Sequence, residues 1–260
     1  MKRYLIVNAD DCNLTPGVTQ AILDCHDHGI LTSTTFMINL PVEASTVRNL
    51  LRRKRLGVGI HLNVTLGKPV LEAAKVKTLV DSQGFFKKRQ TLFAGIQKAS
   101  DAFCYELGLE YQSQINRFCK VFGRLPTHLD THHQVHDHPF FLEALSKVAA
   151  KNKLPIRRSA LLLNKSEARI SNLKTTEYIF GNLTTEGYWR KGPLETILKN
   201  LPQGISEIMC HPGKNDAALR AISSFTSGRE EEWKLFRAPA MRALVVRQGI
   251  TLSHFGLCYT

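Results

Sequence analysis

Two adjacent aspartates, Asp10 and Asp11, directly follow a short apolar segment over residues 4–8. Like charges that lie close together repel one another, and burial increases that cost, so a positive group is expected beside them. A divalent metal ion is the most economical such group, because one carboxylate can bind the ion while its neighbour reaches water on it. The alternative is that Asp11 caps the helix that follows.

Histidines are concentrated in one short stretch of the chain. Residues 128–138 hold five of the ten histidines: His128, His132, His133, His136 and His138. Neutral imidazole is the commonest nitrogen ligand for transition metals, and it needs an acceptor that fixes its tautomer. Asp130 is placed to be that acceptor. The alternative is a chance cluster on a surface loop.

Two further histidines occupy places where chemistry is expected. His61 lies in the apolar segment over residues 57–63, which contains two glycines that could allow close packing. It is either a metal ligand or a core histidine with satisfied hydrogen bonds. His211 precedes Pro212 and Gly213, so it is either a general acid, whose pKa suits that work, or a turn residue.

Together these residues have the composition of a metal-assisted hydrolase. One carboxylate and two histidines make an open metal site, and one aspartate and one histidine are left for proton transfer. The metal would polarise a carbonyl and activate water, the aspartate would take a proton, and the histidine would protonate the leaving group. Cys12 and Cys210, beside these residues, are interpreted as small buried side chains rather than nucleophiles.

The elements that must position these residues alternate between short apolar segments and longer amphipathic ones. Strands are expected at residues 4–8, 33–40, 56–64, 127–130, 155–158, 177–180, 207–210 and 250–253. Helices are expected at residues 15–28, 43–54, 91–122, 139–152 and 229–247, the last interrupted at Pro239, with a loop at 67–90. The pattern predicts an α/β fold, namely a distorted seven- or eight-stranded β/α (TIM-like) barrel in a single domain over 1–260, with an open doubly wound sheet as the alternative. The polar residues follow the predicted strands, at the barrel end that carries active sites.

Composition limits the class of protein further. With 43% hydrophobic and 22% charged residues, the 260-residue chain is globular rather than disordered. The net charge of +13 is typical either of a protein with an anionic partner or of a basic protein that its charge keeps dispersed. No motif for nucleic-acid binding and no membrane-spanning apolar run is found, so neither partner is expected. Six cysteines without C-x-x-C spacing indicate free thiols and a cytoplasmic protein.

Six short motifs, in order along the chain, give it a family resemblance. They are LIVNADD at 5–11, GILTSTT at 29–35, GIHLN at 59–63, GKP at 67–69, PTHLDTHH at 126–133 and MCHP at 209–212. With them the chain resembles the YdjC-like carbohydrate deacetylases, which include chito-oligosaccharide deacetylases. The resemblance implies a barrel of the glycoside hydrolase/deacetylase type and removal of acetyl from sugars that contain N-acetylglucosamine.

The resemblance also implies roles for individual residues and for one divalent ion, Zn²⁺ or Mg²⁺. Carried over by position, these are the metal ligands Asp11, His61 and His132, the general base Asp10, the general acid His211, and the substrate-site residues Arg157 and His133. Arg157 would orient Asp10 or the substrate. A homodimer is a further expectation by resemblance.

Departures from the family pattern bear on the substrate. Cys12 and Asn13 stand where the family usually has Phe and Gly, and Gln134 stands where a third histidine is common. Because Asn tolerates a left-handed backbone, the turn after the aspartates is expected to survive. Hydrolysis of a phosphorylated sugar or of another amide on the same barrel is the alternative function, and nucleic-acid binding with a structural metal ranks last.

Overall fold

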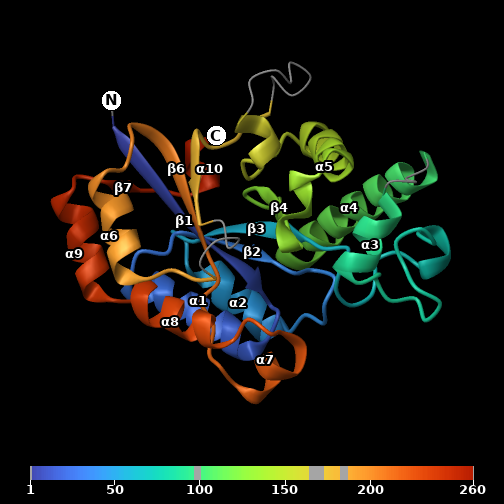
Figure 1. Ribbon diagram of the computed structural model, residues 1–260, viewed down its shortest axis with the longest axis horizontal. Coiled ribbons are helices and arrows are strands. Elements are labelled where there is room, and N and C mark those ends of the chain that lie inside the picture. Colours follow the sequence, from blue (N-terminus) through green and yellow to red (C-terminus); the bar gives the residue numbers. More distant parts are fainter. Residues whose placement is uncertain (1, 97–100, 164–172, 182–186, 260) are drawn as a thin grey trace. The chain divides into compact units, whose positions relative to one another are not determined.

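Strand β1 (Arg3–Cys12), labelled in Figure 1, lies in the first part of the computed structural model. It pairs in parallel with three other strands. Its partners are β2 (Ser33–Phe36), β6 (Gly204–Cys210) and β7 (Thr251–Leu252), and β5 (Tyr178–Phe180) pairs in parallel with β6. Leu5, Ile6 and Val7 have no exposed surface. A strand that is covered on both faces explains why this segment is continuously apolar.

The structure describes residues 2–96, 101–163, 173–181 and 187–259. The chain divides into two units. The first consists of Met1–Phe36, Ala44–Val58 and Thr176–Thr260, and the second of Met37–Glu43 and Gly59–Thr175. The expectation of a single domain over 1–260 stays a prediction.

Helices of the first unit follow its strands in the expected alternation. They are α1 (Pro16–His28), α2 (Ala44–Arg52), α6 (Lys191–Lys199), α7 (Ala217–Ile222), α8 (Ser227–Phe236), α9 (Pro239–Arg247) and α10 (Phe255–Cys258). The Thr15 side chain accepts a hydrogen bond from the Val18 N–H (3.1 Å) and so caps α1, with Pro16 in the first turn. The interpretation of Asp11 as the helix cap is therefore wrong.

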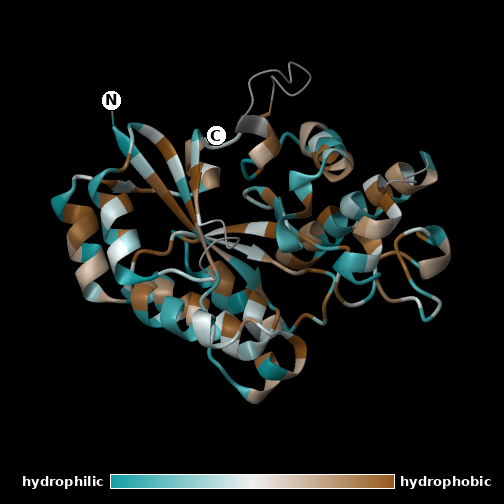
Figure 2. Cartoon of the chain, viewed as in Figure 1, coloured by the Kyte–Doolittle hydropathy of each residue, from teal (hydrophilic) through white to brown (hydrophobic). Residues whose placement is uncertain are grey.

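Strand β3 (Gly57–Leu62) belongs to the second unit from Gly59 onward. It pairs in parallel with β4 (Leu129–Thr131), with His61 opposite Asp130. The helices of this unit are α3 (Arg89–Ile96), α4 (Asp101–Phe122) and α5 (Pro139–Asn152), with short 3₁₀ helices η1 (Ala73–Lys75), η2 (His132–Asp137) and η3 (Ala160–Leu163). Figure 2 shows hydrophobic and hydrophilic residues interleaved along the helices, as expected for helices that bury one face.

The predicted fold class is confirmed. In the described part of the first unit the strand order is β2-β1-β6-β5, with β7 on β1, and in the second unit β3 pairs with β4. All of these pairs are parallel, as in an α/β half-barrel. In the same described ranges, no helix combines the length and the apolar character that crossing a membrane requires.

Several predicted boundaries were wrong. Strand β1 extends through Cys12 instead of ending at residue 8, and the strand expected at 33–40 ends at Phe36. The strand expected at 155–158 is a single parallel bridge between Leu129 and Ile156. The helix expected at 91–122 is α3 and α4, and residues 97–100 lie outside the described residues. The interruption at Pro239 is confirmed, because α9 begins there.

Candidate metal and catalytic site

The two aspartates lie in an irregular part of β1. The register between β1 and β2 shifts between Ala9 and Cys12, and Asp11 adopts a left-handed backbone with φ 65°. Both aspartates are buried, with 3% and 2% of their surfaces exposed. Asn13 has φ 75°, so the expectation that asparagine preserves the left-handed turn is confirmed. Backbone strain of this kind is concentrated at functional sites, because the surrounding structure must hold it in place.

Arg229 supplies a positive charge beside Asp11. Its Nη2 lies 2.6 Å from Asp11 Oδ2, and its side chain is buried in the first unit. Its Nε donates to the Phe225 carbonyl (3.1 Å). The sequence predicted that the aspartates need a positive group but did not identify Arg229, since no motif surrounds it and it begins a run of ordinary helical residues.

Asp10 and His211 are brought together by the pairing of β1 with β6. Ala9 lies opposite Cys210, which places the next residue of each strand at the same sheet edge. His211 Nε2 is 3.6 Å from Asp10 Oδ2, and Asn8 Nδ2 donates to Asp10 Oδ1 (3.0 Å). An imidazole and a carboxylate at this separation can act as an acid–base pair.

Glu232 is a buried carboxylate that sequence reasoning missed. It lies on α8, has no exposed surface, and accepts hydrogen bonds from the backbone N–H groups of Trp189 (3.1 Å) and His211. Burial raises the pKa of Glu232 to about 7, although these two N–H donors oppose the shift. Glu232 therefore fixes the backbone at His211, while the ring of Phe225 meets the His211 imidazole edge to face at 6.0 Å.

His61 belongs to a buried cluster of charged and polar side chains in the second unit. Its Nδ1 lies 2.7 Å from Asp130 Oδ1, and Arg157 Nη1 lies 3.0 Å from Asp130 Oδ2. Burial alone would raise the pKa of Asp130, but His61 and Arg157 hold it well below its usual value. With Asp130 as acceptor, His61 carries its proton on Nδ1 and presents Nε2 as a ligand atom. The expectation that Asp130 fixes a histidine tautomer is supported, and His61 is that histidine.

Arg157 has no exposed surface. Its ion pair with Asp130 favours a positioning role over direct contact with a substrate, because a fully buried guanidinium offers no surface to a sugar. That it orients Asp10 stays a prediction.

His132 and His133 follow β4 in the first turn of η2. Their rings stack with centroids 3.9 Å apart, and the His132 ring meets the His61 ring edge to face at 5.3 Å. His132 is buried, whereas His133 is exposed and has φ 57°. Thr65 Oγ1 lies 2.9 Å from His133 Nδ1. The left-handed backbone thus turns two successive histidines to the same side, one buried and one open to solvent.

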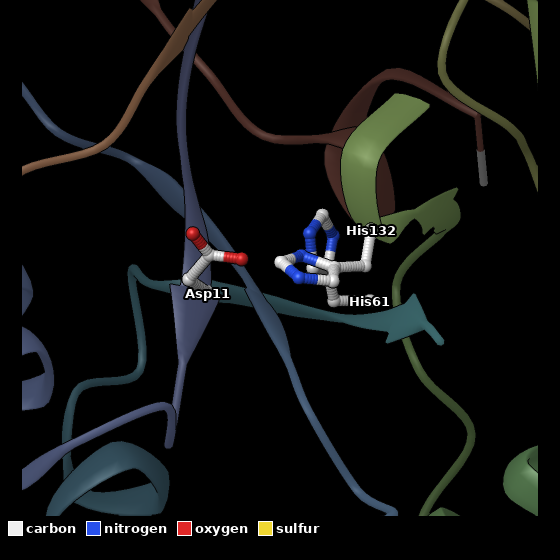
Figure 3. A group of neighbouring side chains, drawn as sticks. All are labelled: Asp11, His61 and His132. Atoms are coloured by element: carbon white, nitrogen blue, oxygen red, sulfur yellow. The ribbon is translucent and has the colours of Figure 1, made fainter. Parts of the chain in front are cut away.

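Two groups of side chains in the described ranges offer donor atoms for one ion. The candidate donor groups are Asp11, His61 and His132, drawn in Figure 3, and Asp10, His61 and Asp130. The first group suits a divalent ion better, since the Asp130 oxygens already face His61 and Arg157. A carboxylate and two imidazoles are an ordinary donor set for a catalytic metal with open positions.

Other predicted features have structural roles. A Cβ on Gly59 would lie 2.5 Å from the His128 ring, so this glycine allows close packing, as expected. His136 Nδ1 lies 2.6 Å from Thr131 Oγ1. Cys12 and Cys210 are buried, as expected. Burial raises the pKa of the Cys12 thiol to about 12, which disfavours the reactive thiolate. None of the six cysteines, all of which lie in the described residues, forms a disulfide.

Comparison with known proteins connects this geometry to a family. The family model described as "YdjC-like protein" matches residues 4–247. A carbohydrate deacetylase of Thermoanaerobacter pseudethanolicus is 34% identical over 98% of this chain and 99% of its own. A chitooligosaccharide deacetylase of Yersinia enterocolitica is 30% identical over 99% of this chain and 100% of its own.

Solved structures agree with the fold. A proposed cellobiose-phosphate cleavage protein of Enterococcus faecalis V583 is similar over 100% of both chains, with a TM-score of 0.87 and 28% identity. The Xyl-CE4 domain of a multidomain xylanase from the hindgut metagenome of Trinervitermes trinervoides has a TM-score of 0.53 at 9% identity, over 98% of this chain and 88% of that domain. At that identity the second likeness shows the fold alone.

Proposed function

Because this chain belongs to the YdjC-like protein family, we propose that it is a metal-dependent carbohydrate deacetylase that acts on oligosaccharides containing N-acetylglucosamine. The relatives that match nearly its whole length are named carbohydrate and chitooligosaccharide deacetylases. The observation that carries the proposal is the donor set of Asp11, His61 and His132. The rings of His61 and His132 meet edge to face at 5.3 Å in the second unit, and Asp11 is a buried carboxylate of the first.

These three side chains would hold one divalent ion. The donor set suits Zn²⁺ by its softness, and Mg²⁺ is the alternative. When bound, the ion would polarise the acetamide carbonyl and lower the pKa of a water molecule. Asp130 and Arg157 keep His61 in the tautomer that such a ligand needs.

Proton transfer falls to Asp10 and His211. Asn8 Nδ2 donates a hydrogen bond to Asp10 Oδ1. Asp10 Oδ2, which faces His211, would accept the proton of the attacking water. His211 Nε2 lies 3.6 Å from that oxygen and would donate a proton to the departing amine. Glu232 holds the His211 backbone, which limits how far the imidazole can move during this exchange. The exposed His133 is the proposed sugar contact.

The test is release of acetate from a series of N-acetylated oligosaccharides. Protein stripped with a chelator should be inactive, and added Zn²⁺ or Mg²⁺ should restore acetate release. His61→Ala should lose the metal, which elemental analysis of the purified variant measures, and should stay inactive in added metal. Acetate release that survives chelation would contradict metal dependence.

Phosphate release, measured on the same samples with phosphorylated sugars, tests the alternative hydrolase. The net charge of +13 favours an anionic sugar as the substrate of that alternative. Phosphate release without acetate release would replace the deacetylase proposal.

A further inference from the structure

Buried acids and a buried arginine lie around the end of β1 in the described part of the first unit. In this part of the first unit, Asp10, Asp11 and Glu232 are 3%, 2% and 0% exposed, and the Arg229 guanidinium lies among them at 4%. Glu232 and Arg229 stand three residues apart on α8, the helix that contributes a contact both to Asp11 and to the backbone of His211. A cation therefore already occupies the surroundings of the proposed metal ligand.

We propose that Arg229 is a resident counter-ion of the metal site, which keeps Asp11 in place when no metal is bound and weakens the binding of a divalent ion. The inference rests on the proposed function in one respect, namely that Asp11 is a metal ligand.

The first half of the proposal follows from the cost of a buried carboxylate. Asp11 combines burial with a left-handed backbone at φ 65°, and both features need compensation from the surrounding structure. The ion pair of 2.6 Å between Arg229 Nη2 and Asp11 Oδ2 supplies it. Without metal, this charge-assisted bond restrains the Asp11 carboxylate.

The second half follows from the permanence of the guanidinium charge. Arginine does not lose its proton in proteins, so Arg229 cannot become neutral when a second cation arrives. Nor can it swing away easily, because its Nε donates to the Phe225 carbonyl, its guanidinium lies 5.4 Å from the centre of the Phe225 ring, and its carbonyl accepts from the Gly213 N–H. The ion and Arg229 would thus share one carboxylate while they repel each other.

The experiment compares Arg229→Met and Arg229→Gln with wild type by isothermal titration calorimetry of the metal-free protein with ZnCl₂ and MgCl₂. Both variants remove the charge, and glutamine keeps an N–H donor. We expect metal affinity to rise by about tenfold or more, because a nearby unit charge that repelled the ion is gone. Thermal melting should show a lower melting temperature than wild type without metal and a larger increase on adding metal.

The matched control is Arg53→Met. Arg53 forms a comparable two-bond ion pair with Asp27 in the same unit, but the pair is partly exposed and distant in sequence from the site. This variant should bind metal as wild type does. Recovery of the Arg229 variants only from metal-containing buffer would also support the proposal, because the ion would then replace the missing charge.

Metal affinity that stays equal to wild type or falls in both Arg229 variants would overturn the proposal, since Arg229 would then only orient Asp11. Failure of the proposed function is recognised separately. If His61→Ala binds metal as wild type does, the proposed ligand set is wrong. If His61→Ala loses the metal but both Arg229 variants bind it as wild type does, only the counter-ion role of Arg229 is rejected.

Discussion

The two units differ in how they neutralise their buried charges. In the first, Asp10 and Asp11 share the end of β1 with one guanidinium, Arg229. In the second, Asp130 lies between His61 and Arg157, and each of its oxygens meets one of these partners. Among these contacts, the aspartates at the end of β1 lie beside Arg229 and His211, whereas each oxygen of Asp130 has a partner of its own.

Under the proposed function, the two clusters would make distinct contributions. A group of buried carboxylates attracts a cation, and one of them can supply a base. A balanced cluster cannot accept another charge cheaply, so it serves to hold one imidazole in a fixed tautomer and orientation. Substitutions on the first side should therefore alter chemistry, and substitutions on the second should alter stability.

The largest expected effect is that of Asp10→Asn on turnover. An amide cannot accept the proton, so the rate of acetate release should fall by about 10²- to 10⁴-fold, the usual contribution of a general base. Because Asp10 is outside the proposed ligand set, elemental analysis should find the metal content of wild type. Turnover like that of wild type would remove Asp10 from its role and weaken the division between the two sides.

On the balanced side, Asp130→Asn should lower the free energy of unfolding by about 3–5 kcal/mol, because it leaves the Arg157 charge buried without its partner. Urea denaturation measures this loss. The control is Glu143→Gln, which breaks the exposed pair of Lys147 and Glu143 (2.7 Å) and should cost less than about 1 kcal/mol. Equal losses in the two variants would show that the cluster is not a structural unit.

Glu232 predicts a dependence of stability on pH. Burial raises its pKa from 4.5 to about 7, so between these values the folded protein keeps a proton that the unfolded chain releases. The free energy of unfolding should therefore fall as pH rises through this window, by about 3 kcal/mol in total, and then level off. Urea denaturation from pH 4.5 to 8 should show that Glu232→Gln lacks this decline. Parallel curves for variant and wild type would mean that Glu232 is already ionised at pH 4.5.

The smallest effect is expected at Asn13, where φ is 75°. Asn13→Ala should lower the free energy of unfolding by about 1 kcal/mol, because a left-handed backbone disfavours a Cβ without a polar side chain. Asn13→Gly should change it by less than about 0.5 kcal/mol, since relief of strain offsets the added freedom of the unfolded chain. Urea denaturation of both variants measures these changes. A larger loss of unfolding free energy for Asn13→Gly than for Asn13→Ala would contradict this explanation.

Much of the fold could be predicted because apolar periodicity, helix caps and helix-breaking prolines are local features of the sequence. The buried segment before Asp10, the Thr15 cap and the break at Pro239 all depend on neighbours within a few residues. The bounds of β1 and the single bridge at Ile156 could not be predicted, because pairing with distant strands determines where a strand ends.

The sequence by itself determined which side chains were available for chemistry: the paired aspartates, the histidine within β3, the histidines after β4 and β6, and the family to which their motifs belong. Only the tertiary structure decided how each is held and charged. Arg229 and Glu232 carry no local signal, since an ordinary helix brings them to Asp11 and to the backbone of His211 across more than two hundred and about twenty residues, respectively. Electrostatic energies depend on distance and burial in space, and neither is written in the spacing of residues along a chain.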